Sequence, residues 1–238
     1  HSQHYQITCL KNRGKSNQSK AIENGISEKF LLPTVCKAVD VQVPIFTTSD
    51  FEHLRKENKN VFLLNSSRDP DTAVLKYLRK GENEKIHERY LPASRKPWFS
   101  LEKRPPSPIW VTVFNRKGVR FIRNEASISN LTTFHCVYLN LFSEPKTDLL
   151  MAYLLTDVSS EILGDHRREY GGGLEKFEPN DINNSMIVDL TKLTHHAELK
   201  IIQLYKKISN SLRSRSGAND HILSEIDEIF RESFQIEK

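Results

Sequence analysis

Apolar residues recur every three or four positions in two successive runs near the C-terminus. The first run is Leu199, Ile202, Tyr205, Ile208 and Leu212, and the second, beyond Gly217, is Ile222, Ile226, Phe230 and Phe234. This spacing places each run on one face of a helix. Neither run is long enough for a coiled coil. Residues 191–238 are therefore predicted to form a helical hairpin that packs on the body of the protein.

Short runs rich in β-branched and aromatic residues predict strands in the middle of the chain. In the strongest of them, Trp110–Phe114 alternates, Asn115–Gly118 forms a loop that ends in glycine, and Val119–Arg123 returns. This is the pattern of a β-hairpin, with Trp110 and Phe114 on the same face. Further strands are expected at Val35–Val43, Asn60–Asn65, Phe134–Leu141 and Met186–Leu190.

Earlier helices are predicted from capping residues and apolar spacing. One begins at Ser49, and another follows an Asp69–Thr72 turn and buries Val74, Leu75 and Leu78. Residues 149–163 (LLMAYLLTDVSSEIL) are expected to form one buried helix, because their start is apolar nearly all round. The elements predict an α+β fold: a mixed sheet of short strands with hairpins and packed helices. Residues 1–190 would form one domain, followed by the two-helix C-terminal extension.

Positive charge is concentrated in one part of the chain. Residues 79–123 hold twelve Lys+Arg and four acidic residues, a net charge of +8, which leaves −3 for the rest of a chain whose total is +5. Localised basicity favours an anionic partner, of which nucleic acid is the commonest. A lysine-rich solubilising surface is the alternative.

Aromatic residues and prolines interleave with these cations between Arg89 and Asn124. The aromatic residues are Tyr90, Trp98, Phe99, Trp110, Phe114 and Phe121, and five of the ten prolines lie in the same stretch. Pro97 biases Lys96 toward an extended backbone, so Arg95 and Trp98 are expected on a stiff strut. We expect Trp98 to anchor this strut in the core and Arg95 to face a phosphate or a guanine edge.

Motifs of the common nucleotide-binding and hydrolytic sites are absent from the sequence. It contains no GxxxxGK[ST] loop, no GxGxxG after a strand and no GxSxG elbow. Gly171–Gly173 is the one glycine cluster, and it predicts either a tight connection or a close approach of backbone to a ligand or a DNA phosphate. The adjacent His195 and His196 point in different directions on a helix, so no metal site is predicted.

Cysteine content and hydropathy bear on the compartment. The three cysteines share no CxxC spacing, which argues against a disulfide framework or a structural zinc site. No apolar run approaches the length of a membrane span, and no signal peptide is evident at the N-terminus. We expect a cytoplasmic protein of a bacterium or an archaeon.

The order of motifs resembles the C-terminal target-recognition region of N6-adenine DNA methyltransferases of restriction–modification systems. The family pattern is an Arg-x-Pro-Trp-aromatic element, a proline stretch and a hairpin that ends in Arg-Phe-x-x-Asn. The matching residues are Arg95–Phe99, Pro105–Pro108 and Arg120–Asn124. Farther on, Asn130–His135 and the segment from Arg167 through Gly171–Leu174 to Glu178–Ile182 match as well. The resemblance covers roughly residues 20 to 190.

Two family motifs are missing, and they are those of catalysis. The S-adenosylmethionine-binding turn is absent, and Arg104–Ser107 has the wrong flanks for the Asn/Asp/Ser-Pro-Pro-Tyr/Phe motif. The resemblance therefore implies a recognition domain without catalytic residues, cofactor or metal of its own. S-adenosylmethionine would bind to a methyltransferase catalytic domain, in cis or in a partner subunit.

The implied partner is double-stranded DNA, from which the catalytic domain would flip out an adenine. The predicted DNA-contacting residues are Arg95, Lys96, Arg116, Lys117, Arg120, Arg123, Arg167, Arg168, Gly171, Gly172 and Gly173. Arg167 and Arg168 could equally dock the catalytic domain.

Two other functions stay open. An RNA-binding or single-strand-binding module would also interleave cations with aromatics. A metal-dependent nuclease would use Asp189, Glu198 and Lys200, although chance spacing explains these residues better.

Overall fold

The computed structural model describes residues 15–66, 69–102, 104–116, 118–140, 143–164, 168–170, 174–214 and 220–237. Their contacts divide the chain into two compact units. The first unit takes its described residues from His1–Asp40, Thr48–Pro106 and Ala126–Thr133, and the second from Val41–Thr47, Ser107–Glu125 and Phe134–Lys238. The domain boundary that the sequence suggests at residue 190 stays a prediction.

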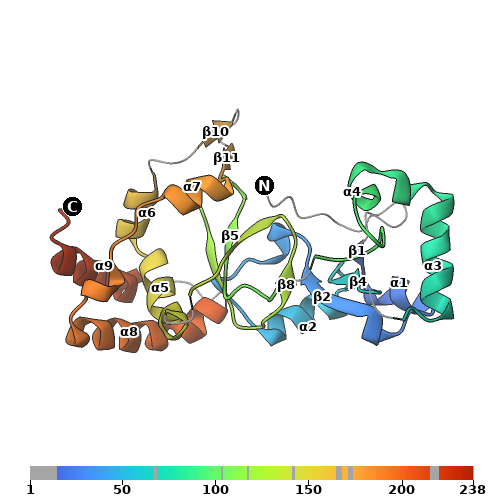
Figure 1. The fold of residues 1–238 in the computed structure, drawn as a ribbon. Helices are drawn as coiled ribbons and strands as arrows, with labels where there is room; N and C mark the ends of the chain where they lie inside the picture. Colours follow the sequence, from blue (N-terminus) through green and yellow to red (C-terminus); the bar gives the residue numbers. More distant parts are fainter. Residues whose placement is uncertain are drawn as a thin grey trace. The chain divides into compact units, whose positions relative to one another are not determined.

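A four-stranded sheet forms the centre of the first unit (Figure 1). Its order is β1 (Lys15–Ser16), β4 (Phe62–Leu64), β2 (Leu31–Val35) and β8 (Ser129–Asn130). β2 runs antiparallel to β4 and parallel to β8. β4 lies within the strand predicted at Asn60–Asn65 and confirms it. The strand predicted at Val35–Val43 is wrong, because β2 ends at Val35, the last residue that pairs with β8, and the chain turns into the 3-10 helix η2 (Ala38–Asp40).

Helices lie between and after the first three strands of this sheet in the sequence. They are α1 (Gln18–Glu23), η1 (Glu28–Phe30), α2 (Thr48–Lys56), α3 (Thr72–Asn83), η3 (Ile86–Glu88) and α4 (Tyr90–Ala93). The predicted cap of α3 is confirmed, since a carboxylate oxygen of Asp71 accepts a hydrogen bond from the Val74 amide at 3.0 Å. Val74 and Leu78 are buried against α1 and β4, but Leu75 is 44% exposed, so the predicted apolar face of α3 is too wide.

The second unit is built on a sheet with the order β3 (Ile45–Phe46), β7 (Phe121–Asn124), β5 (Ile109–Thr112) and β9 (Phe134–Val137). The predicted hairpin is confirmed, because β5 and β7 pair antiparallel with Trp110 opposite Ile122. Every residue of β5 is buried, however, so the strand has no solvent face. Trp110 packs between Phe46 and Phe134, with ring centroids 5.5 and 5.2 Å apart.

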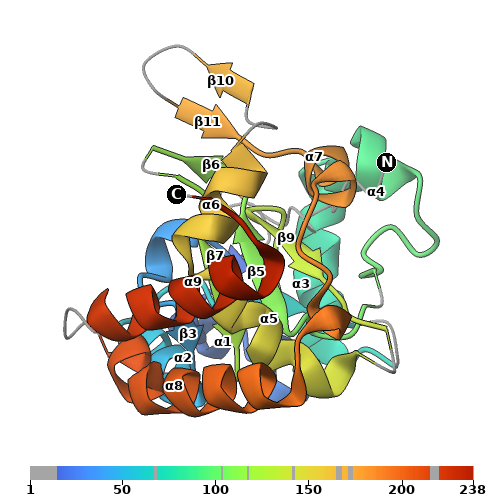
Figure 2. The same cartoon turned by 90° about the vertical axis from the view of Figure 1, so that its left-hand side faces the viewer.

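A separate three-stranded sheet branches from the hairpin. After β5 the chain forms β6 (Phe114–Asn115), which pairs with β11 (Leu174–Lys176), and β11 pairs with β10 (Arg168–Tyr170). The alternating pattern predicts that Phe114 shares a strand with Trp110. In the structure the two residues belong to different strands. Figure 2 shows β10 and β11 at the top of the view, on the side of the unit away from α8 (His195–Arg213).

Helices cover the larger sheet of this unit. The helix predicted for residues 149–163 is two helices, α5 (Thr147–Leu154) and α6 (Asp157–Gly164). Two hydrogen bonds accompany the break, one local and one from a distant residue: the Thr156 hydroxyl donates to the Tyr153 carbonyl at 2.6 Å, and Asp227 accepts the Val158 amide at 2.8 Å. The C-terminal pair is confirmed as α8 and α9 (Asp220–Phe234).

The segment between α7 (Pro179–Asn184) and α8 contains no strand. Met186 and Ile187 are 73% and 52% exposed, and the short helix η5 (Leu190–Lys192) follows. The strand predicted at Met186–Leu190 is therefore wrong, because Val188 alone among its first three residues enters the core. Leu199 is also exposed, unlike the other members of its predicted stripe. The mixture of helices and short mixed sheets confirms the α+β class. Among the described residues no helix combines the length and the apolar character that a membrane span requires.

A buried ion pair on α9 fixes the start of α6. Asp227 and Arg231 are 7% and 8% exposed, and Nε of Arg231 donates to Oδ2 of Asp227 at 2.8 Å. The other carboxylate oxygen of Asp227 caps α6 at Val158, and Arg231 also donates to Glu161 at 2.6 Å. Asp227 therefore serves as a helix cap supplied by a distant part of the chain.

We expect Asp227→Ala to lower the free energy of unfolding by at least about 1 kcal/mol, the typical value of a helix cap, and to leave Arg231 without this partner. Asp227→Asn should cost less, because its amide oxygen still accepts the Val158 amide. Urea unfolding measures both. The control is Glu228→Ala, at an exposed neighbour on α9. Equal stability of Asp227→Ala and the control would contradict the capping role.

Candidate nucleic-acid interface

The three-stranded sheet β10–β11–β6 brings together two stretches that are far apart in sequence. Phe114 lies opposite Lys176 and Asn115 opposite Glu175 in the β6–β11 ladder. Arg116, an exposed predicted DNA contact, follows β6 directly. Arg168, another predicted contact, belongs to β10. The tip of the predicted hairpin and the segment around the glycine cluster therefore lie in one sheet.

An exposed aromatic ring and a partly buried cationic group meet on this sheet. Phe114 is 57% exposed, and Nζ of Lys176 lies 5.7 Å from the centroid of its ring. The same ammonium group pairs with the Glu178 carboxylate. The sequence singles out Arg116 but gives no signal for Lys176, because only the strand register places it beside the hairpin. Of the other predicted contacts, Lys117, Arg167 and Gly171–Gly173 lie outside the described residues.

Arg120 is held within the second unit. Its Nη1 donates to the Val41 carbonyl at 2.8 Å, and its backbone closes the hairpin by bonding with Thr112. Burial lowers the pKa of the Arg120 guanidinium from its ordinary value. The contacts give Arg120 a structural role. A contact with DNA stays a prediction for this residue.

Arg123 likewise joins elements of its own unit. Its Nε donates to the Asp148 carboxylate of α5 at 3.0 Å, and its Nη1 donates to the Pro108 carbonyl at 3.1 Å. The side chain is 21% exposed. Arg123 thus ties β7 to α5 and to the entry of β5, and its predicted DNA contact is not tested by this geometry.

The segment Arg95–Phe99 consists of bends and a turn, and the extended backbone predicted for Lys96 stays a prediction. The amide of Arg95 bonds to the Pro92 carbonyl at 3.0 Å, and its Nη1 donates to the Ser100 carbonyl at 2.8 Å. The amide of Ser100 also bonds to the Pro97 carbonyl at 2.9 Å, so hydrogen bonds of successive turns fold the segment. Lys96 is exposed, as a DNA contact requires.

Trp98 anchors this turn, as its position in the sequence predicts. The indole packs on the first unit's apolar cluster, which includes Val74 and Leu78, and its Nε1 donates to Glu82 at 3.2 Å. The ring is half-buried and makes an edge contact with Phe99 at 5.6 Å between centroids. Trp98 therefore stabilises the turn by packing and by its hydrogen bond.

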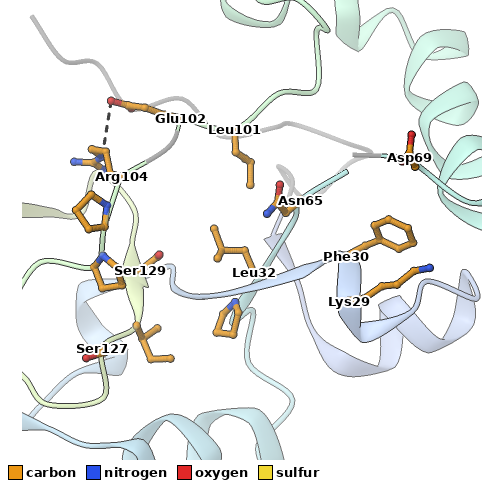
Figure 3. Close-up of a pocket in the computed structure, with 14 residues that line it drawn as sticks. Lys29, Phe30, Leu32, Asn65, Asp69, Leu101, Glu102, Arg104, Ser127 and Ser129 are labelled. Carbon is orange, nitrogen blue, oxygen red and sulfur yellow. Dashed lines mark ion pairs between the residues drawn. The ribbon is translucent and has the colours of Figure 1, made fainter. Parts of the chain in front are cut away.

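The first unit also contains a pocket of about 810 Å³ beside β2 and β8 (Figure 3). Figure 3 shows Lys29, Phe30, Asn65 and Asp69 on one side and the Glu102–Arg104 ion pair on the other, with Nε and Oε1 3.8 Å apart. Leu32, Pro33, Leu101 and Ile128 are among the apolar residues that line it. The lining cations Lys29 and Arg104 are balanced by Asp69 and Glu102. The lining residues that the structure describes therefore carry no surplus positive charge of the kind that an anion site needs.

The three residues of the possible nuclease site each interact with a different partner. Asp189 caps η5 through the Thr191 amide at 3.1 Å, Glu198 pairs with Lys146 at 3.0 Å, and Lys200 pairs with Glu225 at 2.9 Å. Among the described residues no group of three or more His, Cys, Asp or Glu side chains is placed to hold a metal ion. The geometry offers no support for metal-dependent cleavage by these residues.

The fold is similar to that of part of a restriction enzyme. The type IIG restriction endonuclease BpuSI matches 95% of this chain with 28% of its own, at a TM-score of 0.50 and 14% sequence identity. The identity is low, so this likeness concerns the fold alone.

Family comparison identifies the class of the chain. The model described as "Type II methyltransferase M.Eco57I, C-terminal domain" matches residues 16–230, and the chain belongs to this family. Type II methyltransferase M.AccI of Acinetobacter calcoaceticus is 48% identical over 224 residues, which cover 93% of this chain and 41% of that protein. M.XamI of Xanthomonas campestris pv. amaranthicola is 26% identical over 170 residues, 71% of this chain and 32% of that protein. The resemblance to a C-terminal region of restriction–modification methyltransferases is thus confirmed, and the chain spans less than half of each of these relatives.

Arg123 offers a test that separates a structural contact from a DNA contact. We expect Arg123→Gln to lower the free energy of unfolding by about 1–2 kcal/mol, because charge-assisted hydrogen bonds to Asp148 and Pro108 are lost. Asp148→Asn should reproduce part of this loss. Neither change should alter the salt dependence of DNA binding. A lower salt slope for Arg123→Gln with unchanged stability would show that Arg123 faces DNA instead.

Proposed function

We propose that this chain is the duplex-DNA recognition domain of an adenine-N6-specific DNA methyltransferase whose catalytic domain lies outside these residues. The observation that carries the proposal is the β6–β11 pairing of a methyltransferase C-terminal domain, which places Lys176 beside the exposed Phe114 and next to the exposed Arg116 that follows β6. Such a cationic and aromatic surface suits a nucleic-acid partner. The chain would work in the cytoplasm of a bacterium or an archaeon, where this DNA lies.

Recognition would divide between two kinds of contact. Lysine and arginine bind phosphates and supply affinity that does not depend on sequence, whereas side chains that reach base edges supply specificity. Arg116 and Lys96 are exposed and suit the first role. Arg120 and Arg123 contribute by fixing the hairpin that carries Arg116, through their bonds to Val41 and Asp148.

S-adenosylmethionine and the adenine pocket are assigned to the catalytic domain, because the residues present here do not fit them. The Pro-Pro dipeptide of the chain is followed by Ser107, where the family motif requires an aromatic residue. Ser107 is fully buried, and its Oγ lies 2.6 and 2.8 Å from the carbonyl oxygens of Ile109 and Val137. This hydroxyl is engaged with carbonyl groups of β5 and β9.

Binding of the purified chain to DNA tests the proposal. Fluorescence anisotropy of a labelled random-sequence duplex, measured across a salt series, should show binding that weakens steeply with salt. An unlabelled duplex should compete better than the corresponding single strand. Preference for the single strand would favour the single-strand-binding or RNA-binding alternative. Absence of binding to either probe would contradict a nucleic-acid function.

Arg116→Ala tests the position of the interface. Loss of one phosphate contact should weaken binding to all sequences and reduce the magnitude of the salt slope by about 0.9. The matched control is Lys207→Ala, which removes an exposed cation from α8. α8 lies at the opposite end of this unit from β10 and β11 in both views (Figures 1 and 2). An unchanged slope for Arg116→Ala, or an equal change in the control, would remove Arg116 from the interface.

A further inference from the structure

Tyr90, at the start of α4, is the most exposed large hydrophobic side chain that the structure describes. It is 86% exposed, compared with 73% for Met186 and 57% for Phe114. Within the described part of the chain, its side chain makes no hydrogen bond, ion pair or ring contact. The ring therefore has no polar or aromatic partner among the described residues of its own unit. Tyrosine offers a large, flat contact surface with only two side-chain torsions to fix, which suits it to an interface.

Buried neighbours and hydrogen bonds hold the backbone on both sides of Tyr90 in place. Ile86 in η3 is 1% exposed and Pro92 in α4 is buried, so both sides of Tyr90 are anchored. The Ala93 amide bonds to the Arg89 carbonyl at 2.9 Å, and Trp98 fixes the following turn to Glu82 of α3. Tyr90 is thus an exposed ring on a preorganised support, which reduces the entropy lost on binding.

The charge around Tyr90 indicates the class of partner. Residues 85–100 hold four Lys+Arg and one acidic residue, Glu88. Lys85, Arg89 and Lys96 are exposed, whereas Arg95 folds back on the Ser100 carbonyl. Glu88 lies 3.8 Å from Nε2 of His87. A solvated aromatic ring in a segment with exposed cations fits a polyanion with flat apolar faces, which is the chemistry of DNA.

We propose that Tyr90 contacts the bases of duplex DNA by stacking on them or by wedging against a base step, while Arg89 and Lys96 bind the flanking phosphates. Side chains that insert between base steps contact apolar base faces, and this requires a ring or apolar group that projects from a rigid support. The inference rests on the proposed function of the chain and adds the residue that provides a non-ionic contact. This contact belongs to the first unit, whereas Arg116 belongs to the second.

Tyr90→Ala separates a base contact from an ionic one. We expect affinity for a random-sequence duplex to fall about 5-fold or more, since a base–aromatic stack typically contributes this much or more. The salt slope should stay unchanged, because no cation is lost. Tyr90→Phe should bind nearly as wild type, whereas Lys96→Ala should lower the slope by about one unit. Ile22→Ala is the control, because Ile22 is 70% exposed on α1 of the same unit.

A second measurement uses the wild-type chain and needs no variant. Irradiation of a bromouracil-substituted duplex should cross-link the peptide that contains Tyr90, as peptide mapping by mass spectrometry would show. Affinity of Tyr90→Ala equal to that of Ile22→Ala, a loss accompanied by a changed salt slope, or cross-links without the Tyr90 peptide would each overturn the inference. Failure of the wild-type chain to bind duplex DNA would instead overturn the proposed function itself.

Discussion

The burial of β5 on both faces is the constraint on which the second unit depends. Trp110 is fully buried between Phe46 and Phe134, and the flanking strands β7 and β9 complete the enclosure. Such a strand cannot present side chains to a ligand. The chain reaches solvent only beyond Thr112, where Phe114 and Asn115 leave the ladder and pair with β11. The surface that we propose for DNA therefore begins where the buried strand ends.

The burial of β5 also explains why two arginines predicted to contact DNA bind groups within the protein. Arg120 and Arg123 lie on the return strand or just before it, next to β5, and their guanidinium groups bond to Val41, Pro108 and Asp148. These bonds fix the base of the hairpin. Arg116, beyond the ladder, is exposed. Arg120 and Arg123 thus stabilise the hairpin, whereas Arg116 is placed to bind a phosphate.

Local patterns in the sequence predict the elements that depend on local forces. The cap of α3 at Asp71, the β5–β7 hairpin and the helices α8 and α9 follow from side-chain spacing and turn chemistry. Errors arise where distant residues decide the outcome. Asp227 of α9 helps to define α6 as a separate helix, and the register with β11 draws Phe114 away from β5. Neither event leaves a signal in the segment that it changes.

The candidate site likewise has features that the local sequence predicts and features that it does not. Composition identifies the basic, aromatic stretch, and motif order identifies the methyltransferase family, whose C-terminal domain model matches residues 16–230. The exposure of individual side chains is not predictable in this way. Trp98 and Tyr90 are both aromatic residues among cations, yet Trp98 packs on the first unit's core while Tyr90 is 86% exposed. Burial of Ile86 and Pro92 on either side decides that Tyr90 points to solvent.

The central claim is that duplex DNA contacts the surfaces around Tyr90 and around the β6–β11 pair. Hydrogen–deuterium exchange of the chain with and without a duplex tests it most directly, because amide protection maps contact surfaces along the whole chain. The account predicts added protection in residues 85–96 and in strand β11, with α8 and α9 unchanged. Protection confined to α8 and α9, or no change anywhere at saturating duplex, would contradict it.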